Sequence, residues 1–241
     1  MCTVTIVPRG VDNFILTSNR DEAPERLSSE PAFYNVDDAK LLYPKDELSG
    51  GTWVGVSELN RVVCVLNGGF EKHVRKYAYS KSRGVVAKEF MVTNNVCLLV
   101  ENYNFHGIEP FTMVIVDWEA GLQIFELVWD EKEVHFKQLP NEPKLWSSTT
   151  LYSQEMKESR QEWFHNFKSQ NELSSSSVLE FHKTAGQGNL DYGVVMDRGF
   201  VKTTSITQII KEGNEVEMQF QNLESHIISS QTFNLPNKVN G

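Results

Sequence analysis

A cysteine at the second position is the residue of this chain best suited to act as a nucleophile. Cys2 directly follows Met1, and a small second residue permits removal of the initiator methionine. The mature chain would then begin with a residue that carries both a thiol and a free α-amine. A free thiol has a pKa of about 8.5 and an α-amine one of about 7.7–8.0, so the amine can take the thiol proton. Cys2 is therefore a candidate nucleophile with its own base; the alternative is a cysteine that stands there by chance.

A predicted hairpin would bring a charged run back to this cysteine. The segments Thr3–Val7 and Phe14–Thr17 are rich in β-branched and apolar residues, and residues 10–13 between them have turn chemistry. The run Ser18–Glu22 follows the second strand directly. Because the two strands of a hairpin are antiparallel, we expect this run to end beside Cys2.

Two side chains of the run could assist a thiol. Arg20 would favour the thiolate by its positive charge, and Asp21 would hold the α-amine. The alternative interpretation is a solvated cluster of charges after a strand.

The rest of the chain reads as strands and helices in alternating groups. Strands are predicted at 53–56, 62–66, 111–117, 122–129, 134–138, near 194, at 201–210 and at 216–221, and helices at 82–92, 95–102, 153–167 and from 177 after a serine loop at 174–177. This order favours two sheets with helices outside them. We predict a single domain over residues 1–241, a frayed tail from about residue 233, and specificity-determining loops at 23–49 and 70–81.

Composition excludes several classes of protein. With 241 residues, 40% of them apolar, the chain can bury a sizeable core. Its net charge of −9 opposes nucleic acid or an anionic membrane as the main partner. No membrane span, secretory signal or disulfide framework is visible, so we predict a cytoplasmic protein. No histidine spacing typical of zinc and no nucleotide-binding motif occurs, so we predict no metal.

Two further groups of residues are open to interpretation. The basic cluster Lys72–Arg83 could attract an anionic substrate or form a solvated loop. Cys64 and Cys97 are both predicted to be inert thiols of the core.

Four short motifs in a compatible order resemble the NRDE family, also called the transport and Golgi organization 2 family. They are Met-Cys-Thr at the start, Asn-Arg-Asp-Glu at 19–22, Gly-Gly-Thr-Trp-Val-Gly-Val at 50–56 and Ser-Arg-Gly at 82–84. The family resembles the N-terminal nucleophile (Ntn) hydrolases. The resemblance implies an α+β fold, a four-layer αββα sandwich of two mainly antiparallel sheets, and a cysteine nucleophile freed by loss of Met1. Choloylglycine hydrolases and penicillin V acylases are similar proteins that cleave non-peptide amides.

The resemblance also implies roles for individual residues. Cys2, Arg20 and Asp21 would be catalytic, and Asn67 would donate its amide to an oxyanion hole or, alternatively, be a turn asparagine. The candidate substrate-binding residues are Asn19, Trp53 and Lys202, with Trp53 expected in the core or in a pocket wall.

The sequence departs from the hydrolase pattern at two places. The relatives carry an asparagine before the long helix, where this chain reads Trp-Ser-Ser-Thr-Thr at 146–150. They also carry an arginine in a late strand, where this chain offers only Lys202. Ser148, Thr149 or Lys202 could substitute for the missing groups.

Three functions follow from these observations. The first is an N-terminal cysteine amidohydrolase that cleaves an amide C–N bond of a small molecule without a cofactor. The second is a haem-binding or haem-trafficking protein on a hydrolase-like fold, with haem as its ligand. The third is an interaction protein with no small ligand. The sequence leaves the substrate and the oligomeric state open.

Overall fold

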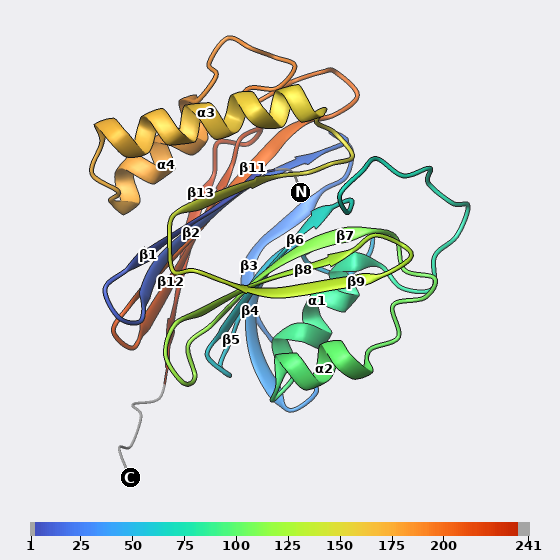
Figure 1. Ribbon diagram of the computed structural model, residues 1–241. Helices are drawn as coiled ribbons and strands as arrows, with labels where there is room; N and C mark the ends of the chain where they lie inside the picture. The colour runs from blue at the N-terminus through green and yellow to red at the C-terminus, as the bar shows by residue number, and fades with distance from the viewer. Residues whose placement is uncertain (1–2, 236–241) are drawn as a thin grey trace.

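The protein consists of two antiparallel β-sheets and four helices, seen here in a computed structural model (Figure 1). The structure describes residues 3–235; Met1, Cys2 and residues 236–241 lie outside that part. The six-stranded sheet has the order β10 (Lys144–Ser147), β1 (Thr3–Arg9), β2 (Asn13–Glu22), β11 (Lys202–Glu212), β12 (Glu215–Asn222) and β13 (Ile228–Asn234). The seven-stranded sheet has the order β3 (Ser28–Val36), β4 (Ala39–Asp46), β5 (Val54–Ser57), β6 (Arg61–Asn67), β7 (Phe111–Asp117), β8 (Gln123–Trp129) and β9 (Val134–Leu139).

The helices cover the outer faces of the two sheets. Helices α3 (Gln154–Gln170) and α4 (Ser175–Thr184) lie on the six-stranded sheet, and α1 (Arg83–Val92) and α2 (Val96–Asn102) lie on the seven-stranded one (Figure 1). The main hydrophobic core fills the space between the sheets and continues beneath α1. This arrangement confirms the predicted four-layer αββα sandwich.

The first hairpin has the register on which the site depends. Strand β1 pairs with β2 from Thr3 opposite Asn19 to Arg9 opposite Asn13. Side chains alternate between the two faces of a strand, so Val4 faces the other sheet while Thr3 faces the helix layer. The predicted hairpin is therefore confirmed, and its open end carries the charged run.

Two glycine motifs let α1 lie directly against β5. A Cβ on Gly84 would stand 2.8 Å from the backbone nitrogen of Thr52, and a Cβ on Gly51 would stand 2.9 Å from the carbonyl carbon of Gly84. A Cβ on Gly55 would meet the sulfur of Met91 in α1 at 2.7 Å. Because side chains are excluded at these positions, the start of α1 and the turn before β5 meet backbone to backbone.

Four predicted features differ from the structure. The expected loop at 23–49 contains β3 and β4, because an alternating edge strand and the short apolar run at 41–43 escape a periodicity search. Helix α4 begins at Ser175, since Ser174 caps it and forms a capping box with Ser177. Val194 lies in a bend rather than a strand, and its amide donates to the carbonyl of Ala185 at 3.0 Å. At the start of the predicted tail, Phe233 belongs to β13 and is buried; residues 236–241 of that tail lie outside the described part.

Candidate functional site

A cleft of about 250 Å³ opens between the two sheets, at the edge where β2 and β6 end. The start of α1 and the segment before it close the other side. The lining side chains are Arg20, Glu22, Arg26, Asp46, Ser49, Thr52, Trp53, Val65, Asn67, Arg75, Tyr79, Lys81, Ser82, Arg83 and Glu109, with Gly84 between them. The cleft therefore brings together three of the four sequence motifs.

Arg20 is the buried cation at the inner wall of this cleft. Its guanidinium donates to Asp46 at 2.9 Å, to the carbonyl of Arg26 at 3.0 Å and to the hydroxyl of Thr204 at 3.2 Å. It also lies 4.7 Å from the centre of the Trp53 ring. Burial lowers the pKa of Arg20 although nearby carboxylates raise it, and an arginine stays charged at any physiological pH.

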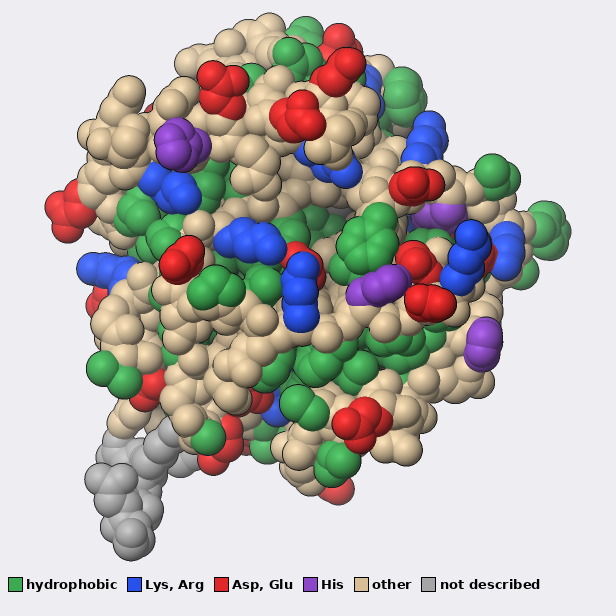
Figure 2. Space-filling model, viewed as in Figure 1, with side chains coloured by type: hydrophobic (Ala, Val, Ile, Leu, Met, Phe, Trp, Pro, Cys, Tyr) green, Lys and Arg blue, Asp and Glu red, His purple; other side chains and the backbone are tan. Residues whose placement is uncertain are grey.

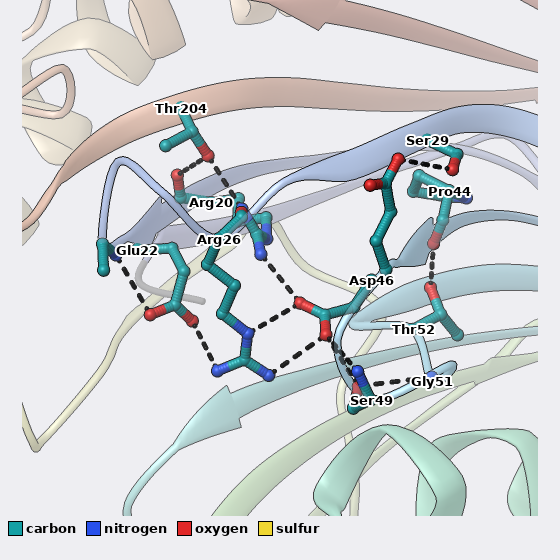
Figure 3. Close-up of polar contacts among 12 residues, drawn as sticks. Arg20, Glu22, Arg26, Ser29, Pro44, Asp46, Ser49, Gly51, Thr52 and Thr204 are labelled. Atoms are coloured by element: carbon teal, nitrogen blue, oxygen red, sulfur yellow. Dashed lines mark hydrogen bonds and ion pairs between the residues drawn. The ribbon is translucent and has the colours of Figure 1, made fainter.

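Asp46 lies between two guanidinium groups, as Figure 3 shows. Arg26 donates to it at 2.8 and 3.3 Å, and the Ser49 amide and hydroxyl donate at 2.9 and 2.8 Å. Burial by itself would raise the pKa of the Asp46 carboxyl, but the hydrogen bonds from Arg26 and Ser49 outweigh it and hold the pKa below its usual value. A second carboxylate, Glu22, pairs with Arg26 at 3.1 Å. The inner wall is thus a charged network fixed in one geometry.

Asn67 and Trp53 line the same cleft as Arg20. Asn67 ends β6, and its backbone carbonyl accepts a hydrogen bond from the Ser148 hydroxyl at 2.7 Å. The Thr149 hydroxyl donates to the carbonyl of Gly69 at 2.6 Å. The hydroxyl groups that stand where the hydrolase pattern has an asparagine therefore join the end of β10 to the end of β6.

Asp21 lies on the opposite face of β2 from Arg20, outside the cleft lining. It is buried and accepts hydrogen bonds from the hydroxyls of Thr203 and Tyr152. The guanidinium carbon of Arg160 stands 3.6 Å from the centre of the Tyr152 ring. Asp21 is thus tied to the helix layer through Tyr152.

Arg160 supports the site from behind the sheet, a role that was not predicted from the sequence. It projects from α3 and is fully buried, and it donates to the Thr3 hydroxyl at 2.5 Å and to the carbonyls of Tyr192 and Gly193 at 2.8 and 2.6 Å. A charged residue on a helix is usually exposed, so its type does not indicate burial. The one signal in the sequence is that Arg160 is in line with the apolar stripe of α3.

Asn19 belongs to the same buried polar layer. Its amide donates to the carbonyls of His182 and Val194 at 3.0 and 2.7 Å, and its oxygen contacts the His182 ring. The other ring nitrogen of His182 lies 2.7 Å from the Thr5 hydroxyl. Burial, helped by the charge of Arg160, lowers the pKa of His182 to about 3. The structure places Asn19 away from the cleft, with no exposed surface for a substrate.

Lys202 also stands apart from the cleft lining. It begins β11 opposite Glu22 and forms an ion pair with Glu224. The hydrogen bond that Lys202 donates to Glu224 within this ion pair raises the pKa of Lys202. The structure therefore does not bring this lysine together with Arg20 and Asn67.

Two of the three cysteines belong to the described part of the chain, and their surroundings differ. Cys2 lies outside the described residues, and the described chain begins with its covalent neighbour Thr3. Cys64 is fully buried, and burial raises the pKa of its thiol to about 12, which makes it inert as predicted. Cys97 is exposed on α2, so its prediction as a core thiol was wrong; the short helix presents it to solvent.

The basic cluster forms one wall of the cleft. The segment between β6 and α1 contributes Arg75, Tyr79 and Lys81 to the lining, and Arg83 at the start of α1 adds a further cation. Figure 2 shows charged side chains of both signs, histidines and apolar groups mixed at the right-hand edge, where Figure 1 places this segment. Over residues 3–235, no three metal-ligating side chains converge as they would around an ion. No described helix has the length and apolar character to cross a membrane.

Comparison with known proteins agrees with this architecture. Two variants of conjugated bile acid hydrolase from Clostridium perfringens superpose with TM-scores of 0.55 and 0.56 at 10% identity, covering 99% and 98% of this chain and 100% and 94% of theirs. An N-acylethanolamine-hydrolyzing acid amidase ortholog from Caenorhabditis elegans gives a TM-score of 0.51 at 10% identity, covering 87% of this chain and 92% of its own. These proteins share the Ntn-hydrolase fold.

Sequence comparisons give a more specific result. A search of curated proteins finds no match. The family model for Transport and Golgi organisation 2 matches residues 1–154, a span that contains all four motifs and the main strands around the cleft. The chain therefore belongs to the Transport and Golgi organisation 2 family.

Proposed function

We propose that this protein is an N-terminal cysteine amidohydrolase that cleaves a C–N amide bond of a small molecule. The observation that carries the proposal is the placement of Arg20 and Asn67 in one cleft, at the sheet edge where β1 begins at Thr3. Cys2 is joined to Thr3 by a peptide bond. The structural relatives named as a conjugated bile acid hydrolase and an N-acylethanolamine-hydrolyzing amidase support small amides as the substrate class.

The reaction begins with transfer of the Cys2 thiol proton to the α-amine. The thiolate attacks the amide carbonyl carbon, a C–S bond forms, and the carbonyl electrons move onto oxygen. The Asn67 side-chain amide donates a hydrogen bond to this oxyanion, and removing one such donor typically slows an enzyme by about 100- to 1,000-fold. Arg20 contributes positive charge that favours the thiolate over the thiol.

The second half of the reaction restores the cysteine. The tetrahedral intermediate collapses, the C–N bond breaks, and the α-amine gives its proton to the leaving nitrogen. Water, deprotonated by the free α-amine, then attacks the thioester and the C–S bond breaks. The acid leaves, and the sulfur regains a proton. Asp21 acts as a positioning residue and not on the substrate itself, because Thr203 and Tyr152 hold its carboxylate on the face of β2 that points away from the cleft.

A panel of small acyl amides tests the proposal. The native-start protein should release free amine from at least one amide, and Cys2→Ala should abolish the release. Cys97→Ser is the matched control, because Cys97 is an exposed thiol that does not line the cleft. Hydrolysis that survives in Cys2→Ala would contradict the mechanism.

Haem binding is the competing proposal, and the cleft gives it little support. Haem iron is usually held by a histidine, cysteine, methionine or tyrosine. Of these, the described lining offers only Tyr79, whose hydroxyl already accepts a hydrogen bond from the Lys76 amide at 2.9 Å. A hemin titration with a saturable change in the Soret band that disappears in Tyr79→Phe would establish this function instead.

A further inference from the structure

The cleft contains more positive than negative charge, although the whole chain has a net charge of −9. Five cations line it, Arg20, Arg26, Arg75, Lys81 and Arg83, against the three carboxylates of Glu22, Asp46 and Glu109. Glu89, which pairs with Lys81 at 2.7 Å from outside the lining, reduces the excess from two charges to one. An acidic protein therefore keeps a net positive charge at its main candidate site.

The carboxylates of the cleft are already engaged. Asp46 accepts five hydrogen bonds from Arg20, Arg26 and Ser49, which uses the lone pairs that a carboxylate offers. Glu109 forms an ion pair with Arg83 at 3.1 Å and lies 3.3 Å from His73 and 3.9 Å from Arg75. Little acceptor capacity is left among the acidic groups for a ligand that brings only hydrogen-bond donors.

Arg75, in contrast, has donors to spare at the mouth of the cleft. Arg75 is 79% exposed and its nearest carboxylate oxygen is 3.9 Å away, beyond hydrogen-bond distance. Lys81 is 43% exposed; its ammonium donates to both carboxylate oxygens of Glu89 at 2.7 and 3.0 Å and lies 3.5 Å from the hydroxyl of Tyr103, so it brings positive charge to the mouth rather than a free donor. Both lie on the segment before α1 and line the same cleft as Arg20.

A buried hydrogen-bond donor, the indole N–H of Trp53, is independent evidence for a ligand with acceptor atoms. The indole N–H of Trp53 has no acceptor in the part of the chain that the structure describes, although the residue is only 5% exposed and lines the cleft. Burying an unpaired donor is costly. A ligand that brings acceptor oxygens would match both this wall and the mouth.

We infer that the substrate carries an anionic oxygen group, a carboxylate or a phosphate, which Arg75 and Lys81 bind at the mouth of the cleft. That the ligand is a substrate rests on the proposed function, but the binding of an anion at this place does not depend on it. The amide of such a ligand lies deeper, toward Arg20 and Asn67. Arg83, which pairs with Glu109 at 3.1 Å and donates to the carbonyl of Pro110 at 3.3 Å, also lines the cleft.

Calorimetry on the full-length Cys2→Ala protein tests the anion site without catalysis. The probes are N-hexanoylglycine, N-hexanoylethanolamine phosphate and neutral N-hexanoylethanolamine. At low salt, the preferred anion should bind about tenfold more tightly than the neutral amide, which corresponds to about 1.4 kcal/mol. The two anionic probes separate a carboxylate from a phosphate substrate.

Charge variants locate the effect. Arg75→Gln combined with Lys81→Gln should reduce the preference for the anion to about twofold, as expected when exposed charge contacts are lost, and leave the neutral probe unchanged. Both side chains are exposed, so the fold is preserved. Lys132→Gln combined with Lys183→Gln removes the same charge from exposed positions outside the lining and should leave the preference intact.

The outcomes separate the two proposals. Equal affinity for all three probes, or no binding of either anion, would overturn the anion site. Hydrolysis of only the neutral amide by the native-start protein would overturn it as well and leave the amidohydrolase standing. Selective binding of an anion without hydrolysis of any probe would support the site and count against the amidohydrolase.

Discussion

The Nη1 of Arg160 donates a hydrogen bond to the hydroxyl of Thr3 at 2.5 Å, so a residue in the middle of α3 holds the first described residue of β1. The same guanidinium stacks on Tyr152, which donates to Asp21. Arg160 therefore reaches both the chain neighbour of Cys2 and one of its predicted partners from behind the sheet. We regard it as a positioning residue.

Replacing Arg160 should lower stability and turnover together. Arg160→Met leaves the hydroxyl of Thr3 and the carbonyls of Tyr192 and Gly193 without this donor, which we expect to cost about 3 kcal/mol or more. Arg160→Lys keeps the charge and should recover part of the loss. Urea unfolding measures the first effect, and kcat should fall more than KM rises. Lys157→Met on the same helix is the control; an Arg160→Met protein as stable and active as this control would contradict the role.

The mass of the native-start protein should be one methionine residue below that of the full sequence. Removal of Met1 frees the α-amine that the mechanism needs as its base. Brief treatment of the native protein with iodoacetamide should label Cys97 and Cys2, whereas Cys64 should react only after unfolding, because burial raises its thiol pKa to about 12. In Cys97→Ser the remaining native label should map to Cys2. A retained Met1 would remove the base and contradict the mechanism.

His182 should make the protein less stable as the pH falls. Its folded-state pKa of about 3 lies below the unfolded value of about 6.5, so in acid only the unfolded chain takes up this proton. The contribution is complete above about pH 6.5 and is lost toward pH 3, by up to about 1.4 kcal/mol per pH unit. His182→Gln should flatten the dependence of the unfolding free energy between pH 7.5 and 5, while His106→Gln should not. Parallel curves for the wild type and His182→Gln would refute this.

Gly84→Ala should displace α1 from the cleft. The added methyl group would stand 2.8 Å from the Thr52 nitrogen and 2.9 Å from its oxygen, both of which are backbone atoms with little freedom to move. Such overpacking typically costs about 1–3 kcal/mol. Thermal unfolding measures the loss, and affinity for the anionic probe should fall with it. Gly213→Ala, which meets no atom within 4 Å but has a φ of +56°, should lower stability without changing that affinity.

The sequence predicts those parts of the site that depend on local order. The β1–β2 hairpin follows from a short turn between two β-branched runs, and it carries Arg20 and Asp21 to the right sheet edge. The helix at 83–92 follows from the spacing of its apolar residues, and the structure adds the cap at Ser82. These features need only neighbours in the chain, which is why their positions were predicted to within a few residues.

Long-range pairing accounts for what the sequence does not reveal. Asn19 and Arg20 are adjacent, yet only the packing of α4 against β2 decides that Asn19 bonds to His182 while Arg20 faces Asp46. The partners of Arg160 come from residues 3, 192 and 193. Strand β3 is an edge strand with a register shift, and its mixed polarity resembles that of a loop.

The register of the first hairpin also determines the sign of the charge that β2 presents to the cleft. A shift of one residue turns every side chain of a strand to the other face. In β2, that shift would carry Asn19 and Asp21 toward the cleft and bury Arg20 against the helices, replacing a cation with a carboxylate. The turn between Arg9 and Asn13, at the far end of the strands, fixes this register and thereby determines which charged side chain of β2 faces the cleft. A length change in that turn would alter which ligands the protein accepts without touching any residue that binds them.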